Sequence, residues 1–525
     1  MEMDQLSPGI SLFSLAVATI LLWFVLRQAL GGGKDTGAKL PPGPWNLPVI
    51  GSLHHLVIGT KLPPHRALLR LSRRHGPLML VRLGEVPKVI VSTPEAAMEV
   101  LKTNDLTFAT RPSGPTLDIV SSGGRGLVFA PYGEHWRQMR KVCVVEVLSA
   151  RQVRRIESIK QDEVARLLES VAAASTASPA ATVDLGERLA RLTNNVIARA
   201  AFGGECRQQE AYLRELARMS TLVGGFSLVD LFPSSRLVRW LSSAAGDVRR
   251  SHARVQRILG DIIRERQEKK PNADSAATAA RDDEDLLDVL LRLHKEDALS
   301  FPLTPAIISA VIFDIFGAAT DTTAATIEWA MAELIRNPHA MARAKLEVRQ
   351  RLGVHHQRSV VTSADLGDLH YLRMVIKETL RLHPPGPMIH RACQEDCQVM
   401  GYDIPKGTAV MINVFAVGRD PTHWGEDAVE FKPERFKEMG TEYGWQGPQM
   451  EFIPFGAGRR QCPGALLATT TIELVLANLM YYFDWAIPDG AAPETLDMGE
   501  VFGIIVRTRS SLFLQAVAAC HPQDH

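Results

Sequence analysis

The chain has 525 residues, and 59 Lys and Arg against 58 Asp and Glu leave a formal net charge of +1. An apolar fraction of 46% and a charged fraction of 22% are those of an ordinary globular protein, which excludes a wholly disordered chain and a collagen-like repeat. The near-neutral charge gives no basic face for binding DNA or RNA, so we expect no nucleic-acid partner. Six scattered cysteines are too few for a disulfide scaffold and indicate a reducing, cytosol-facing environment.

The amino end carries an apolar segment, residues 9–26, that is long enough to cross a bilayer as one helix. Glu2 and Asp4 precede it, and Arg27 and Lys34 follow it. A cleaved signal peptide carries its positive charge before the apolar stretch, so an uncleaved anchor is the favoured interpretation. The positive-inside rule then places the carboxyl side of the anchor in the cytosol.

A flexible triglycine and the stiff sequence Pro41-Pro42-Gly43-Pro44 follow the anchor and form a spacer. The expected organisation is a lumenal end at 1–8, a transmembrane anchor at 9–26, a hinge and Pro-rich linker at 27–44, and one catalytic domain at 45–525.

The body of the chain is mainly helical by periodicity. Alternation punctuated by Gly84 and Pro87 predicts a hairpin at 78–91. Helical patterns lie at 156–171, 185–201, 248–267, 304–337 and 371–382, and surface loops are expected at 172–182 and 269–285. The pattern at 304–337 is apolar nearly all round in its first half, which indicates a helix through the middle of a core. The predicted fold class is mainly α with small β-sheets.

Cys462 lies in the sequence Phe455-Gly-Ala-Gly458-Arg-Arg460-Gln-Cys462-Pro-Gly464, which fits the pattern FxxGxRxCxG. An inert buried thiol is the common fate of a lone cysteine. No second Cys or His lies at zinc-ligand spacing from Cys462, and Gln461 stands where a dinucleotide fingerprint needs its third glycine. Cys393 and Cys397, separated by three residues, have no partner pair to complete a metal site and are expected to be structural.

This loop resembles the thiolate-ligand loop of the cytochrome P-450 family, the haem-thiolate monooxygenases. The resemblance implies a P-450 fold behind the membrane anchor and a haem b whose iron is held by Cys462. It also assigns parts to the neighbouring residues. Gly458 gives the tight turn and Gly464 the close approach to the porphyrin. Phe455 shields the ligand and Arg460 pairs with a propionate.

Three further motifs extend the resemblance. Glu378 and Arg381 lie three apart on a predicted helix and, with Arg435, look like the family's ExxR and PERF residues. In isolation they would be an ordinary surface ion pair; the resemblance makes them a buried structural triad. Trp136 and Arg140 match a WxxxR motif whose members bind the haem propionates. Arg391 falls where another propionate-binding arginine usually lies.

The central helix carries Ala318-Ala-Thr-Asp321-Thr322, an acid followed by an alcohol in apolar surroundings. Burying such a polar pair costs free energy, which indicates a function for it. The simpler alternative is a helix kink at which the threonine hydroxyl caps a backbone carbonyl. It resembles the family motif in which the acid and the alcohol supply protons, so Asp321 and Thr322 are the candidate catalytic residues. Ala319 replaces the family's usual glycine.

The resemblance covers nearly the whole chain and points to the plant microsomal type of specialised metabolism, in the Ala- and Arg-rich style of grasses. It implies a single-pass protein of the endoplasmic reticulum membrane with its catalytic domain facing the cytosol. No flavin or nicotinamide module remains in the sequence, so electrons from NADPH must come from a separate membrane-bound NADPH-cytochrome reductase. We place its docking face near Arg137, Lys141 and Arg459.

The residues expected over the distal side of the haem are mostly apolar or small, which favours a hydrophobic small-molecule substrate over a charged one. They are Leu117, Asp314, Gly317, Ala318, Met388, Ile389, Phe502 and Ile504. Asp314 is the polar member and either binds a substrate hydroxyl or bonds within the helix bundle. The predicted reaction is insertion of one oxygen atom from O2, most simply hydroxylation of a sesqui- or diterpenoid. The alternatives are a phenylpropanoid, flavonoid or amino-acid-derived substrate, a reductase-independent isomerase or dehydratase, and a non-catalytic haem protein.

Overall fold

The computed structural model describes residues 38–57, 62–177, 181–204, 208–224, 226–268, 284–297, 299–353, 360–438 and 449–519. The expected lumenal end, the anchor at 9–26 and most of the linker lie outside the described residues, as does most of the loop expected at 269–285.

Helices dominate the described part of the chain. The longer ones are α3 (Pro64–His75), α6 (Glu134–Val142), α8 (Glu157–Ala177), α9 (Leu185–Phe202), α10 (Gln209–Leu222), α13 (Ala244–Glu268), α14 (Leu286–Lys295), α15 (Pro305–Arg336), α16 (Pro338–Leu352), α17 (His370–Leu382) and α21 (Ala465–Tyr482). The short ones are α2 (Leu53–Val57), α4 (Pro94–Met98), α5 (Leu117–Val120), α7 (Ala150–Arg155), α11 (Leu228–Leu231), α12 (Arg236–Leu241), α18 (Val414–Val417), α19 (Pro421–Trp424) and α20 (Arg435–Glu438).

The strands are short and gather in small sheets. They are β1 (Leu78–Leu83), β2 (Val86–Val91), β3 (Val183–Asp184), β4 (Met388–Ala392), β5 (Cys397–Val399), β6 (Tyr402–Ile404), β7 (Ala409–Asn413), β8 (Phe483–Ala486), β9 (Glu500–Val501), β10 (Arg507–Thr508) and β11 (Phe513–Ala518). The largest sheet has the order β1-β2-β7-β4, in which only β2 and β7 run parallel. A three-stranded sheet has the order β3-β11-β8, and two hairpins pair β5 with β6 and β9 with β10.

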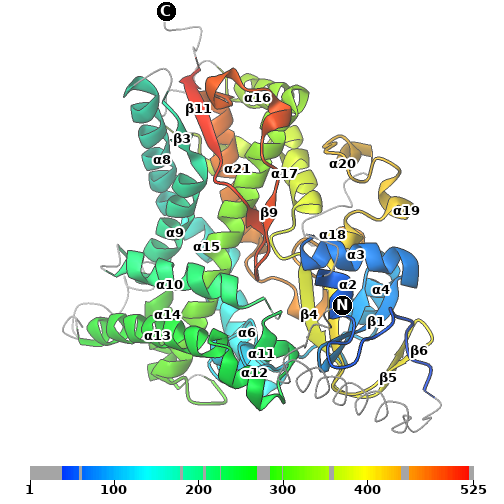
Figure 1. Ribbon diagram of the computed structural model, residues 1–525. Helices are drawn as coiled ribbons and strands as arrows, with labels where there is room; N and C mark the ends of the chain where they lie inside the picture. Colours follow the sequence, from blue (N-terminus) through cyan, green and yellow to red (C-terminus); the bar gives the residue numbers. More distant parts are fainter. Residues whose placement is uncertain are drawn as a thin grey trace, which may run out of the picture.

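Helix α15 runs through the middle of the helical part, between α9 and α17 (Figure 1). It begins where the Thr304 side chain accepts the Ile307 N–H and Pro305 occupies the first turn, and it ends before Pro338. Its 32 residues span about 48 Å at 1.5 Å per residue. Both α15 and α21 are apolar and long enough to cross a membrane, but most of each lies inside the protein, so they are core helices.

The four-stranded sheet and helices α2–α4 lie on the opposite side of the molecule from α8, α9, α13 and α14 (Figure 1). Strand β10 contacts α15, and Pro385 and Gly386 in the turn before β4 line the same cavity as the middle of α15. A site at the middle of α15 can therefore receive residues from both the helical and the sheet-rich parts.

The structure confirms the predicted hairpin as β1 and β2, and the predicted long helices as α8, α9, α13, α15 and α17. The loop predicted at 172–182 is wrong at its start, because α8 continues to Ala177. Alanines such as Ala172 and Ala174 pack against the core, and alanine is the best helix former, so the Ala- and Ser-rich composition continues the helix.

Candidate active site

The Cys462 loop is a tight turn immediately before α21. The Cys462 N–H donates to the Phe455 carbonyl at 2.9 Å, which closes the loop. Gly458 has φ +71°, and a Cβ there would lie 2.2 Å from the Leu101 carbonyl oxygen. Only glycine fits that position, which gives a physical reason for the glycine in the sequence pattern.

The Cys462 thiol faces an internal cavity. Burial raises its pKa, whereas the Gly464 N–H, which donates to the sulfur, and the Arg140 guanidinium lower it. A Cβ at Gly464 would meet only the Cys462 sulfur, at 3.9 Å, so the space beside the thiol is open. Phe455 and Gly464 both line this cavity.

The cavity has a volume of about 360 Å³ and lies between α15, the turn before β4, the Cys462 loop and α6. Its lining is largely apolar, with alcohols contributed by α15. The lining includes Leu127, Phe129, Ala318, Ala319, Thr322, Thr323, Met388, Ile389, Leu467 and Ile504. Ala318 is exposed although it sits in the middle of the core helix, because it faces this space.

Four arginine side chains border the cavity and form what we term the arginine cluster: Arg111, Arg140, Arg391 and Arg460. Burial lowers the pKa of Arg111 to about 10 and that of Arg460 to about 9, and it lowers the pKa of Arg391 well below its ordinary value. The positive charges of neighbouring arginines lower the pKa of Arg391 and Arg460 further. The cluster therefore repels itself and favours an anion beside it.

The protein's own partners for the arginine cluster are mostly carbonyls. Arg460 donates to Ala109, Leu127 and Ala130. The guanidinium of Arg391 donates to the His390 carbonyl at 3.0 Å, and among the described residues no acceptor lies within hydrogen-bond distance of the Arg140 guanidinium. No described carboxylate accepts a hydrogen bond from these cations, although the negative charges of Asp314 and Asp105 raise the pKa of Arg111 and Arg391, respectively.

Trp136 lies buried beside the cluster. Its indole N–H donates to the Leu127 carbonyl at 3.1 Å, and the guanidinium of Arg460 lies 4.1 Å from its ring. The structure thus places Trp136 with Arg140, as the sequence predicts, and gives its N–H a protein acceptor.

A thiol at one wall and a carboxylate-seeking cation cluster at another fit an iron porphyrin with two propionates. The open space beside Gly464 and the unsatisfied donors of Arg140 fit the same group. Zinc does not fit this site, since the described residues contain no group of three His, Cys, Asp or Glu side chains placed to hold a metal ion.

The acid–alcohol pair of α15 divides between two environments. Thr322 lines the cavity, and its hydroxyl donates to the Ala318 carbonyl at 2.7 Å. Asp321 is not among the lining residues and instead forms an ion pair with Arg507 of β10. Burial raises the pKa of Asp321, and Arg507 lowers it. Arg507 is a residue that sequence reasoning missed, because 186 residues separate it from Asp321.

Asp314 lies at the cavity wall with its carboxylate committed to the protein. Its Oδ2 accepts the Leu127 N–H at 2.5 Å and the Val128 N–H at 2.9 Å. Burial raises its pKa to about 6. Of the two parts predicted for this residue, the geometry favours a bond within the protein over one to a substrate.

Five of the eight predicted substrate-pocket residues line the cavity: Asp314, Ala318, Met388, Ile389 and Ile504. The other three predicted residues do not line this cavity. Leu117 packs against the helical core, and a Cβ on Gly317 would face Leu216. Phe502 stacks on His65 at 5.7 Å between ring centroids, outside the cavity.

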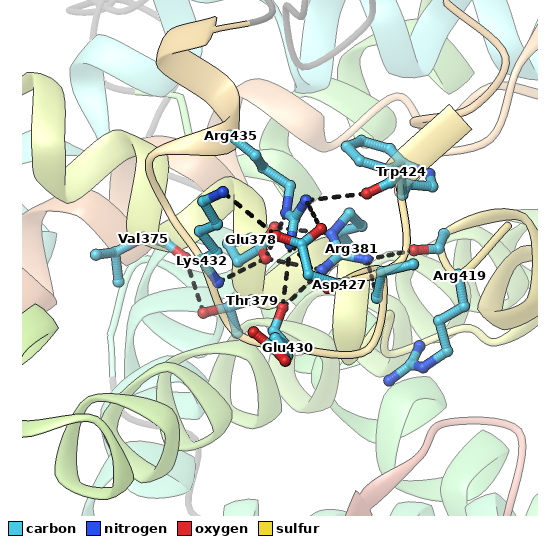
Figure 2. A network of polar contacts seen from close by, with 12 residues as sticks. Val375, Glu378, Thr379, Arg381, Arg419, Trp424, Asp427, Glu430, Lys432 and Arg435 are labelled. Atoms are coloured by element: carbon cyan, nitrogen blue, oxygen red, sulfur yellow. Dashed lines mark hydrogen bonds and ion pairs between the residues drawn. The ribbon is translucent and has the colours of Figure 1, made fainter. Parts of the chain in front are cut away.

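The predicted triad forms a buried network (Figure 2). Arg381 makes two bonds of 2.7 Å to Glu378, and Arg435 donates to Glu378 at 2.9 Å. The remaining donors of Arg381 reach carbonyls of Gly418, Ala428 and Glu430. The side chains of Glu378 and Arg381 are 0% exposed, which excludes a surface ion pair.

The comparisons with known proteins agree with this site. The family model described as "Cytochrome P450" matches residues 41–514. The chain is 43% identical to Zealexin A1 synthase of Zea mays, over 97% of this chain and 98% of that protein. It is 44% identical to Ent-isokaurene C2/C3-hydroxylase of Oryza sativa subsp. japonica, over 92% and 93%. It is also 43% identical to Desmethyl-deoxy-podophyllotoxin synthase of Sinopodophyllum hexandrum, over 95% and 96%.

A solved structure of a zebra fish cytochrome P450 with progesterone matches with a TM-score of 0.71 and 25% identity, covering 87% of this chain and 100% of that one. The fold and the thiol-centred cavity define a haem-thiolate monooxygenase. The chain belongs to the cytochrome P450 family. Its cofactor is haem on a cysteine thiolate, used with O2 and with electrons supplied by a reductase, and its substrate is hydrophobic.

Proposed function

We propose that this monooxygenase hydroxylates a terpenoid of sesqui- or diterpene size in plant specialised metabolism. The observation that carries the proposal is the lining of the cavity around Ala318, where alkyl and aromatic side chains surround the space and the carboxylate of Asp314 is occupied by backbone N–H groups. A hydrocarbon skeleton is held there by shape, and a charged substrate would lose its hydration without compensation. The relatives named for isokaurene and zealexin support the same class.

We assign Cys462 as the haem ligand and the arginine cluster as the partner of the haem carboxylates. The bound haem supplies O2 binding and cleavage of the O–O bond. Gly458 keeps the loop tight enough for the Gly464 N–H to reach the sulfur, which stabilises a thiolate. Phe455 shields the thiol on the cavity side.

Thr322 and Asp321 are assigned to proton supply. The Thr322 hydroxyl stands at the cavity wall, and the neighbouring Asp321 carboxylate is partly exposed beside Arg507 on the other side. Asp321 exchanges protons with solvent from that side. A proton passed on to the Thr322 hydroxyl oxygen is matched by release into the cavity of the hydroxyl's own proton, which the Ala318 carbonyl accepts at present.

We further propose that residues 9–26 anchor the protein in the endoplasmic reticulum membrane with the catalytic domain in the cytosol. The electron donor is then the membrane-bound NADPH-cytochrome reductase. Arg137, Lys141 and Arg459 are exposed, as its docking face needs. Asp105 neutralises part of this charge, since it accepts from Arg459 at 3.3 Å. Charge reversal at Lys141 and Arg137 should lower the salt-sensitive part of the turnover rate.

The test is turnover in microsomes that contain the chain and a plant-type reductase, supplied with NADPH. One pool of compounds holds sesqui- and diterpene olefins, and a second holds flavonoids, phenylpropanoids and amino-acid-derived oximes. Mass spectrometry records products that gain one oxygen atom. Cys462→Ala is the control without the haem ligand, and Asp321→Asn should reduce coupled product formation by about 100-fold or more with Cys462 intact.

NADPH-dependent product from the terpene pool supports the proposal. Product from the second pool alone keeps the monooxygenase and overturns the terpenoid assignment. Product formed from a hydroperoxide without NADPH or reductase would instead support the isomerase or dehydratase.

A further inference from the structure

Cys393 and Cys397 bracket the turn between β4 and β5, and their sulfurs lie 3.6 Å apart. The Cys393 thiol also donates to the Glu395 carbonyl at 2.8 Å, inside the same turn. Cys393 is 2% exposed, whereas Cys397 is partly exposed at the start of β5. One thiol is thus reachable from solvent, and the other is held in van der Waals contact behind it.

This pair is poorly suited to a metal. Among the described residues, no group of three His, Cys, Asp or Glu side chains gathers at the turn or elsewhere. Two thiols in contact, without a third ligand, are instead the arrangement of an attacking and a resolving cysteine. The geometry therefore points to oxidation chemistry rather than to zinc.

We propose that Cys393 and Cys397 form a redox modification site, at which hydrogen peroxide converts the two thiols into a reversible disulfide. The Cys397 thiolate attacks one peroxide oxygen, the O–O bond breaks, and Cys397 sulfenic acid and one water result. The Cys393 sulfur then attacks the Cys397 sulfur and the S–OH bond breaks. The hydroxide leaves as a second water with the Cys393 thiol proton, just as the first water takes the Cys397 thiol proton. Two thiols lose two electrons and one peroxide gains them.

The position of the turn connects this site to the Cys462 loop. The Gln394 side chain donates to the Leu106 carbonyl at 2.7 Å, and its backbone N–H donates to the Thr107 carbonyl at 2.9 Å. Asp105, directly before, accepts the Arg459 N–H at 3.1 Å. The segment 105–107 therefore lies between the dithiol turn and the loop that presents Cys462. Closing the disulfide moves the sulfurs together by about 1.6 Å and disturbs this support.

Burial raises the pKa of the Cys393 thiol and raises that of Cys397 to about 12. Only a small fraction of either is thiolate at neutral pH, so oxidation is slow there. Its rate rises about tenfold for each unit of pH between 7 and 9, because the thiolate is the nucleophile.

The test treats the full-length haem-loaded protein with hydrogen peroxide, alkylates the free thiols, and maps the cysteines by mass spectrometry. Trypsin leaves both in one peptide, 392–406. We expect this peptide to lose about 2 Da, the mass of the two thiol hydrogens, together with both alkylation sites, and a dithiol reductant to restore them.

Cys393→Ser and Cys397→Ser are the matched variants. Each should abolish this loss of mass, and in Cys393→Ser the remaining thiol should stop at a sulfenic acid that dimedone captures. Either variant suffices if the other fails to bind haem. Glutathione added to the same sample reports whether the peroxide is active. If the glutathione is fully oxidised while Cys393 and Cys397 can both still be alkylated, the proposal is overturned. Sulfinic acid on one cysteine without any disulfide would overturn it equally.

Discussion

The molecule contains two sets of interior arginines with opposite surroundings, one buried around Glu378 and one bordering the cavity beside Cys462. In the first, Arg381 and Arg435 surround Glu378, and their donors meet its carboxylate, the Asp427 carboxylate or backbone carbonyls (Figure 2). In the second, the arginine cluster beside Cys462, the hydrogen-bond acceptors are backbone carbonyls. The nearby carboxylates of Asp314 and Asp105 form no hydrogen bond with the cluster, and the guanidinium of Arg140 has no hydrogen bond to a described residue.

This difference separates a structural network from a binding site. A buried charge is costly unless it is paired, so a saturated network stabilises the fold as it stands. A cluster of cations that borders a cavity without a hydrogen-bonded carboxylate favours an anion bound there. The same residue type therefore has two functions, and the count of available acceptors distinguishes them.

Glu378→Gln should break the first set most severely. It removes the carboxylate that both arginines share. Arg381 is then left with carbonyl acceptors alone, and Arg435 keeps only Asp427 as a counter-charge, so the free energy of unfolding should fall by about 3–5 kcal/mol. Denaturant unfolding of the purified protein measures this free energy. If the variant cannot be purified, the yield of haem-bound protein relative to wild type is measured instead.

Glu187→Gln is the matched control, because Glu187 forms an ion pair with Arg191 at the surface. It should leave the unfolding free energy unchanged within error. A change at Glu378 as small as that at Glu187 would contradict the structural assignment of the network.

The sequence predicts the first set better than the second, for a physical reason. Glu378 and Arg381 lie on one helix face and their pairing follows from spacing alone. The ends of α15 were equally predictable, because a capping threonine and two prolines mark them. Arg111 has no such local signature. Its neighbours Val128 and His390 come from distant segments that only the fold brings together.

The three predicted pocket residues that do not line this cavity illustrate the same dependence on the fold. Leu117, Gly317 and Phe502 were placed by their position along the chain, but the direction of a side chain depends on its neighbours. Phe502 points to His65, 437 positions away in a different element, and no pattern in the sequence indicates that contact.

Asp314→Asn addresses the acid that faces the arginine cluster. The pKa of Asp314 rises from 3.8 to about 6 on burial. Between pH 3.8 and 6 the unfolded chain has lost this proton and the folded protein retains it, so stability falls as pH rises, by a total on the order of 3 kcal/mol. Above pH 6 this contribution is constant.

Both backbone N–H groups donate to Oδ2, so an asparagine oxygen at that position preserves both bonds. The difference in unfolding free energy between Asp314→Asn and wild type should therefore grow in favour of the variant from pH 4 to pH 6 and then level off. A difference that stays flat over this range would show that Asp314 titrates normally.

Arg140→Leu tests the second set directly. Because the Arg140 guanidinium has no acceptor among the described residues, its loss should not destabilise the chain without haem, but it should weaken haem binding by about 10- to 100-fold. Titration of haem into the apoprotein measures the affinity. Arg137→Leu, on the exposed face of the same helix, should bind haem like wild type, and a loss of stability without a loss of haem affinity would place Arg140 with the first set.

Arg507→Gln has the smallest expected effect and sharpens the comparison most, because Arg507 neutralises the proposed catalytic acid rather than a structural one. Burial raises the pKa of Asp321 and Arg507 lowers it, so removing the guanidinium leaves burial unopposed and the pKa rises. If the ionised carboxylate accepts protons from solvent, the acidic limb of the profile of product formed per NADPH must move to higher pH. Arg509→Gln, which breaks the exposed pair with Asp497 on the same segment, should leave the profile in place. A shift in both variants would trace the effect to the segment after β10, whereas no shift in Arg507→Gln would mean that protons reach Thr322 by a route that does not include Asp321.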